Sequence, residues 1–186
     1  MRNKAIIESL MCLLKYYKTV SDKVNKDSLH YLIGQTIRQY DIPKDNRHIS
    51  QAAQQLWDKL TTGNISDYHY RNLVTCDKLT EPVSLCVFSG AEKNGKPKEF
   101  KKGDKFIFRE LFHEDHVIPV SLIFKELAIN TPANYADIEN VLNKMHLCVI
   151  LKNEDKKLGR TAGRTLNFEE TIDNVYKKNS IILNVN

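Results

Sequence analysis

Apolar side chains recur at helical spacing through the first third of the chain, and this pattern predicts three helices there. They are expected over residues 5–18, from Asp27 or Ser28 to Tyr40, and over 49–60, with a short fourth helix over 66–76. The apolar stripe of the first helix consists of Ile7, Leu10, Met11 and Leu14. The pattern favours a helical N-terminal region of about 80 residues.

Near residue 80 the pattern changes to short runs of β-branched and aromatic residues, some of them separated by turn residues such as Asn94-Gly95. The expected elements are strands over 82–88, 105–109 and 147–151, and helices over 119–129, 135–145 and 168–178. The predicted fold class is therefore α+β. We expect a helical region over 1–80 that binds DNA or mediates dimerisation, and a second domain over 81–186.

Composition adds a weak preference for a polyanionic partner. The 186 residues carry a formal net charge of +5, and 41% of them are hydrophobic, as in ordinary globular proteins. The four cysteines, at 12, 76, 86 and 148, form no C-x-x-C pair, so we expect buried reduced thiols and no structural zinc. No apolar run approaches a membrane span, and no signal-peptide pattern is present, so a cytoplasmic location is expected.

Two segments carry candidate chemistry. In the first, Phe112 to Pro119, Asp115 and His116 adjoin at the expected end of a strand. The second, His146 to Gly159, is a buried strand that runs into a short helix with an acidic first turn, in which Asp155 lies nine residues after His146. Carboxylates and histidines of this kind can bind a metal ion and move protons.

These segments resemble the motif of the HNH, or ββα-metal, nuclease family. Asp115-His116-Val117-Ile118-Pro119 matches its D-H-x-x-P element, His146 opens the second strand, and Asp155 closes the motif. The resemblance covers about residues 105–185 and includes the trailing helix and strand. It implies a ββα-metal domain, here with two helices inserted between its strands, and an endonuclease acting on double-stranded DNA.

The resemblance also implies residue roles. His116 is the general base that takes a proton from water, and Asp115 and Asp155 hold one Mg²⁺, for which Mn²⁺ can substitute. Asn153 competes with Asp155 as the second metal ligand. His146, in place of the family's usual Asn, braces the catalytic loop or is a core histidine.

Basic side chains supply candidate DNA contacts. Beside the motif they are Lys156, Lys157, Arg160 and Arg164, and in the helical region Arg38, Arg47 and Gln51. Between Glu92 and Lys105 there are six lysines and three acids, so this hairpin either lies along the duplex or is only a soluble tip that protects an edge strand.

The helical region beside a catalytic unit is most similar to the organisation of Type II restriction endonucleases. Cutting both strands with one site per chain requires two copies, so a homodimer on a palindromic site is expected. The alternatives are a homing, nicking or nonspecific HNH nuclease and, from another class, a non-catalytic DNA-binding regulator. No membrane partner is expected.

Overall fold

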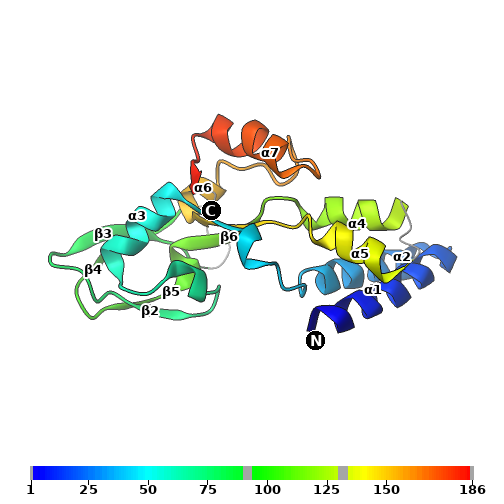
Figure 1. Ribbon diagram of the computed structural model, residues 1–186. Helices are drawn as coiled ribbons and strands as arrows, with labels where there is room; N and C mark the ends of the chain where they lie inside the picture. Colours follow the sequence, from blue (N-terminus) through cyan, green and yellow to red (C-terminus); the bar gives the residue numbers. More distant parts are fainter. Residues whose placement is uncertain (1, 90–93, 130–133, 185–186) are drawn as a thin grey trace.

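The computed structural model describes residues 2–89, 94–129 and 134–184, and it has a mixed α+β fold (Figure 1). Helices gather at one end of the molecule, short strands at the other, and a small sheet joins the two. The helical end consists of α1 (Arg2–Thr19), α2 (Lys23–Ile37), α4 (Val120–Ile129) and α5 (Tyr135–Leu142).

The four helices share one core, although α4 and α5 lie more than 80 residues after α2. Ile7, Leu10 and Leu14 of α1 are buried in it, as their spacing predicts, against Ile123 of α4 and Leu142 of α5. Met11, the fourth residue of the predicted stripe, is 36% exposed. Helix α2 begins earlier than expected because the Asp22 side chain accepts a hydrogen bond from the backbone N–H of Asn25 and caps it.

The central sheet has the strand order β6-β7-β1-β8. Its strands are β6 (Phe112–His116), β7 (Leu147–Leu151), β1 (Arg47–Ser50) and β8 (Leu183–Asn184). Strand β7 pairs antiparallel with β6 and parallel with β1. Because β1 comes from the N-terminal part, the sheet contains residues from both sides of residue 80, as do the core of the helical end and the core around Trp57. The predicted domain boundary there is not a division of the structure.

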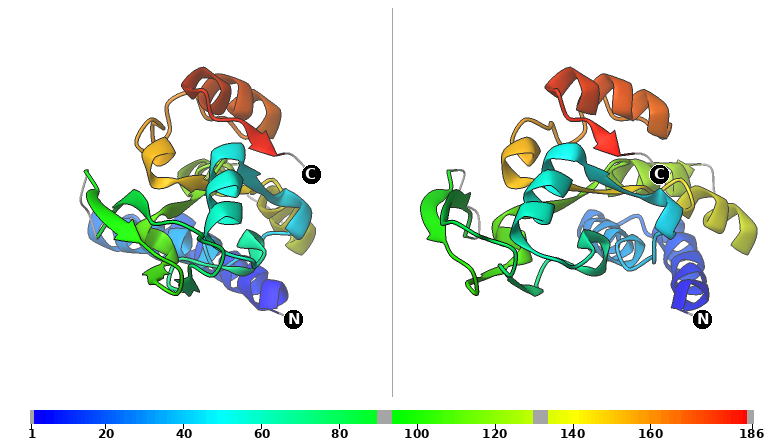
Figure 2. Two further views of the ribbon diagram at one scale, coloured as in Figure 1. Left: turned by 90° about the vertical axis from the view of Figure 1, so that its left-hand side faces the viewer. Right: turned by 60° about the vertical axis from the view of Figure 1, so that its left-hand side comes forward.

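The two faces of the sheet contact different elements. One face packs on α3 (Gln51–Leu60) and the short strands, around a second core in which Trp57 is fully buried. The other is covered by α6 (Lys152–Asp155) and by α7 (Phe168–Thr171), which continues as helical turns to Asn179. Figure 2 shows this C-terminal helix on the side of the sheet away from the N-terminal helix.

One expectation for this region is wrong. Residues 66–76 do not form a helix, because Ile65–Asp67 is a 3₁₀ turn and Leu73–Thr75 is strand β2, paired with β5 (Lys105–Ile107). Strand β3 (Val83–Val87) pairs antiparallel with β4 (Lys96–Phe100), which the sequence pattern did not predict as a strand. Val74 is buried in the second core, so tertiary contact decides this segment.

Helix α3 begins at Gln51, two residues later than expected, because Arg47–Ser50 is a strand. Ser50 ends the strand and caps the helix, accepting from the Ala53 N–H at 3.1 Å. Its hydroxyl also donates to the Glu154 carboxylate at 2.6 Å.

Among the described helices, none has the length and apolar character that a membrane span requires.

We expect residues 81–186 alone not to fold, although the sequence pattern suggests a domain there. That fragment lacks β1, the strand between β7 and β8, and Trp57, whose burial the second core requires. Urea unfolding followed by circular dichroism checks this against the full chain. A cooperative transition in the fragment contradicts the expectation.

Candidate functional site

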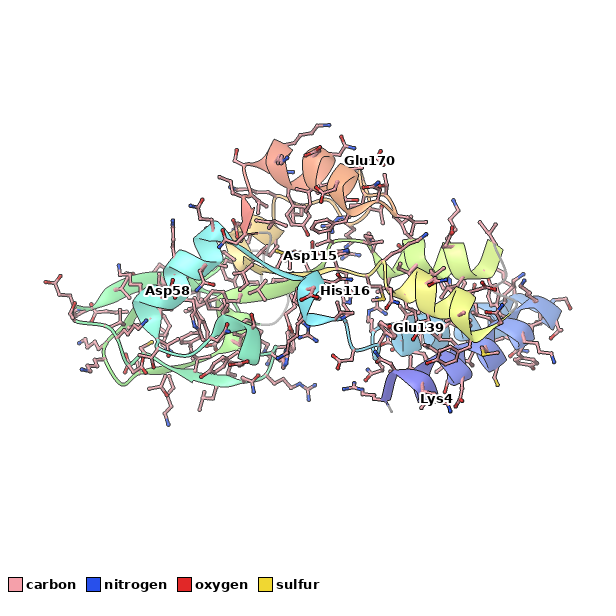
Figure 3. All side chains as sticks on the ribbon, in the orientation of Figure 1. Lys4, Asp58, Asp115, His116, Glu139 and Glu170 are labelled. Carbon is pink, nitrogen blue, oxygen red and sulfur yellow. The ribbon has the colours of Figure 1, made fainter. Side chains whose placement is uncertain are left out.

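Asp115 and His116 lie on opposite faces of strand β6, near the middle of the molecule (Figure 3). Successive side chains of a strand point to opposite faces, and the register pairs Asp115 with Cys148 and His116 with Leu147. Asp115 and His113 therefore share the face covered by α6 and α7. His116 and Glu114 share the other.

The Asp115 carboxylate is engaged by two buried partners. Arg164 Nη2 lies 2.8 Å from Asp115 Oδ2, and the Tyr176 hydroxyl donates to the same oxygen. The pKa of Tyr176 is raised strongly by burial and by the Asp115 charge, so the phenol keeps its proton. The predicted role of Asp115 as a Mg²⁺ ligand does not fit this arrangement, because a guanidinium already neutralises the carboxylate.

Arg164 is an internal residue rather than a phosphate contact. Its side chain is 2% exposed, and besides Asp115 it donates to the backbone carbonyls of His116, Val117 and Gly159. The predicted contact of Arg164 with DNA does not fit this arrangement, because the side chain is buried and these contacts engage four of its five N–H groups. The arginine instead holds the segment after α6 against the end of β6.

The fold brings one predicted site residue, Asp155, together with His113, to which the sequence pattern assigned no role. His113 Nε2 lies 3.5 Å from Asp155 Oδ1, and the two side chains are 32% and 35% exposed. Helix α6 contacts both β6 and β7, which places Asp155 over the strand. Of the two residues predicted to compete for one position, Asn153 is exposed in the first turn of α6 and Asp155 faces the strand.

The turn that positions Asp155 is held by a buried carboxylate. Glu154 is 8% exposed, and its Oε2 accepts from the Ser50 hydroxyl and, at 2.8 Å, from the backbone N–H of Leu151. These bonds join the end of β1 to the start of α6. Sequence reasoning missed Glu154, for which the only signal is an acid at the third position of a helix that follows a buried strand.

The predicted metal centre is not assembled. Among residues 2–89, 94–129 and 134–184, no three His, Cys, Asp or Glu side chains are grouped so that they could hold a metal ion. His116 lies across the sheet from Asp155. Burial lowers the pKa of His116, while the Asp115 charge opposes that shift and Arg38 adds to it.

His146 belongs to a buried aromatic cluster. Its Nδ1 lies 3.0 Å from Nε2 of His48, and both rings stack on Phe168 at the start of α7. Burial lowers the pKa of His48, and burial together with the nearby His48 lowers that of His146 to about 4. His48 Nδ1 is buried without a hydrogen-bond partner among the described residues. His146 therefore packs the C-terminal helix and does not contact His116's face of the sheet.

The other predicted DNA-binding residues lie in two places. Lys156, Lys157 and Arg160 are exposed next to Asp155. Arg38, which follows α2, and Gln51, the first residue of α3, are exposed as well but belong to other elements. Arg47 is partly buried and paired with Asp41 at 3.0 Å. In the central sheet Arg47 lies opposite Leu147, and Leu147 lies opposite His116 on its other side, so the three residues form one row across the strands.

A cavity that sequence reasoning missed adjoins the face that carries His116. It has a volume of about 550 Å³, and Arg47 and His69 line it. His69 Nδ1 lies 3.1 Å from Glu114 Oε1, and the Tyr70 N–H donates to Glu114 as well. Because His69 lies in an irregular segment 45 residues before Glu114, no spacing in the sequence indicates the pair.

Comparisons with protein-family models, with curated proteins and with solved structures gave no match.

Replacing Asp115 by Ala is expected to cost about 3–5 kcal/mol in the free energy of unfolding, because it leaves the buried Arg164 charge unpaired. Asp173→Ala is the matched control, since Asp173 is 61% exposed in its pair with Lys177 and its loss should cost under about 1 kcal/mol. Urea denaturation measures both. Equal losses would show that the Asp115 pair is no more important than a surface pair.

Stability is expected to fall as the pH drops from 6.5 toward 4. In that range an unfolded chain protonates His146, whereas the folded chain, with a His146 pKa of about 4, does not, so acid favours unfolding. The slope for this one proton is at most about 1.4 kcal/mol per pH unit. His146→Asn should flatten the dependence. Parallel curves for wild type and His146→Asn in urea titrations between pH 7.5 and 5 would contradict this.

Proposed function

We propose that the protein is an endonuclease that hydrolyses phosphodiester bonds of double-stranded DNA, with its active site at His113 and Asp155. The observation that supports this is the meeting of a strand histidine and a helix carboxylate across the β6–β7–α6 unit, at 3.5 Å and partly exposed. Two antiparallel strands followed by a short helix form the arrangement that the resemblance to HNH nucleases implies. The two inserted helices, α4 and α5, leave this unit intact.

The pair can supply general-base catalysis. With its hydrogen on Nε2, His113 donates toward Asp155, and the lone pair of Nδ1 takes a proton from water. The resulting hydroxide attacks phosphorus, the bond to the 3′ or 5′ oxygen breaks, and solvent protonates the leaving oxygen. Asp155 holds the ring in this tautomer and stabilises the imidazolium that forms, as carboxylates do in other catalytic pairs.

The surroundings favour a polyanionic substrate. Lys156, Lys157 and Arg160 follow Asp155 directly and are exposed. Arg164 and Asp115, the buried pair beneath, fix the segment that carries these cations. Phosphate contacts from this segment would hold the backbone next to His113.

The finer features implied by the resemblance are part of the proposal. They are dependence on Mg²⁺, sequence-specific cleavage of the restriction type, and a homodimer that cuts both strands. Because Asp115 does not fit a ligand role, the reaction above contains no step through a metal ion. Plasmid cleavage in Mg²⁺, Mn²⁺ and EDTA measures the requirement, and size-exclusion chromatography with light scattering measures the oligomer.

Plasmid cleavage tests the assignment of residues. His113→Ala should reduce the rate at least about a hundredfold, the usual contribution of a general base. Asp155→Asn should reduce it less, because the amide still accepts a hydrogen bond but carries no charge. His116→Ala serves as the comparison, since His116 lies on the opposite face and its loss should leave most of the activity.

Three other outcomes are distinguishable. Loss of activity in His116→Ala but not in His113→Ala would move the site to the opposite face of the sheet. Intact plasmid with every divalent ion, together with measurable DNA binding, would favour the non-catalytic regulator. Discrete fragments indicate sequence-specific cutting and a smear indicates a nonspecific enzyme, and sequencing the fragment ends locates the cuts.

A further inference from the structure

A basic hairpin begins next to the proposed active site and runs away from it. Strands β3 and β4 form a two-stranded sheet of their own, at the opposite end of the molecule from the helices (Figure 1). Its exposed lysines, with those of the following turn and of β5, are Lys96, Lys98, Lys101, Lys102 and Lys105. We call this set the lysine arm.

The arm is joined to α6 at one end. Lys156 Nζ lies 4.2 Å from the centre of the Phe88 ring, and Phe88 directly follows β3. In the register of the hairpin Lys96 lies opposite Val87, while Phe100 lies opposite Val83. Lys96 is therefore at the end of the hairpin near Lys156, and Lys98 lies two residues farther along β4.

The length and the stiffness of the arm suit a nucleic acid backbone. Five strand residues extend about 16 Å, which is the length of about five base pairs at 3.4 Å each. Val83, Leu85 and Val87 pack the hairpin onto the second core, so its backbone is held in place. Lys96 and Lys98 lie opposite Val87 and Leu85 on the same face of the hairpin, and their side chains are exposed. Lys98 lies with its Nζ 4.8 Å from the centre of the Phe100 ring, which limits its freedom further.

Lysines on an edge strand also prevent unwanted strand pairing. That role does not require a second basic segment next to the hairpin, yet here the hairpin begins beside Lys156, which Lys157 follows directly. Only Glu99, paired with Lys101, and Asp104, which accepts from the Lys101 N–H, supply opposite charge among residues 96–105. The arm keeps a net positive charge.

We infer that the lysine arm binds the phosphate backbone of duplex DNA on one side of the cleavage point. The inference rests on the proposed nuclease function, because the site fixes where the duplex lies. The arm adds contacts with phosphates and not with bases, so it contributes affinity that depends on salt and not on sequence.

Binding without cleavage tests the inference. The dissociation constant of a fluorescent 30-base-pair duplex is measured by anisotropy in EDTA at several salt concentrations, with the full chain. Replacing Lys98, Lys102 and Lys105 by Gln should make the slope of log affinity against log salt less steep by about 2–3, because each lost phosphate contact removes about 0.9. At low salt the affinity should fall at least about tenfold.

A matched variant separates the arm from net charge. Lys15, Lys23 and Lys125, replaced by Gln, remove the same charge from the exposed surface of the helical end and should leave the slope unchanged. Equal effects of the two triple variants would overturn the inference. Replacing the same three arm lysines by Arg keeps the charge and should retain wild-type binding, whereas loss of binding there would also overturn it.

The outcome is separate from that of the nuclease proposal. Binding is measured in EDTA and does not depend on cleavage. If the protein is inactive but the arm variant shows a weaker salt dependence of binding, the arm inference stands and the catalytic assignment fails. If the protein is active but the arm variant binds as the control variant does, the catalytic assignment stands and the arm inference fails. Binding of a duplex RNA but not of the DNA would overturn the choice of partner.

Discussion

The ion pair between Asp115 and Arg164 holds together the elements that form the candidate site. A guanidinium with 2% of its side chain exposed is costly to bury, and it is stable here because one carboxylate and three backbone carbonyls accept its hydrogens. Tyr176 donates to the same carboxylate and brings in the C-terminal helix. Strand β6, the loop after α6 and the last helix are thus fixed around one charge pair.

The alternation of a β-strand decides which residues can act together. Asp115 and His116 are adjacent in sequence, and the pleat sends them to opposite faces of β6, where one is neutralised and the other lies near Arg38. His113, two residues before Asp115, is on the face that α6 covers, and there it meets Asp155. The same sheet carries a second histidine–carboxylate pair, His69 and Glu114, on its other face.

The N-terminal and C-terminal halves of the chain each complete a part of the other. Helices inserted between β6 and β7 do not extend the β6–β7–α6 unit but pack on α1 and α2, so the N-terminal helices stabilise an insertion of the C-terminal half. In return β1 completes the central sheet, and its last residue, Ser50, binds the buried Glu154 that shapes α6. Each half therefore supplies a part that the other needs, which explains why no boundary falls near residue 80.

The sequence by itself determined the elements with strong periodicity: the α+β class, three of the four residues in the stripe of α1, and the helix and strand positions around residues 120–151. Local spacing is enough for these, since it sets which side chains share a face of one element. Only the tertiary structure decided the partners across elements, because β1 joins β7 over about 100 residues and Arg164 reaches Asp115 over 49. It also decided the segment 66–76 and two of the four cysteines, Cys12 and Cys86, which are exposed rather than buried. A single strand shows that Asp115 and His116 alternate, but only the packed helices show which face each one meets and what already occupies it.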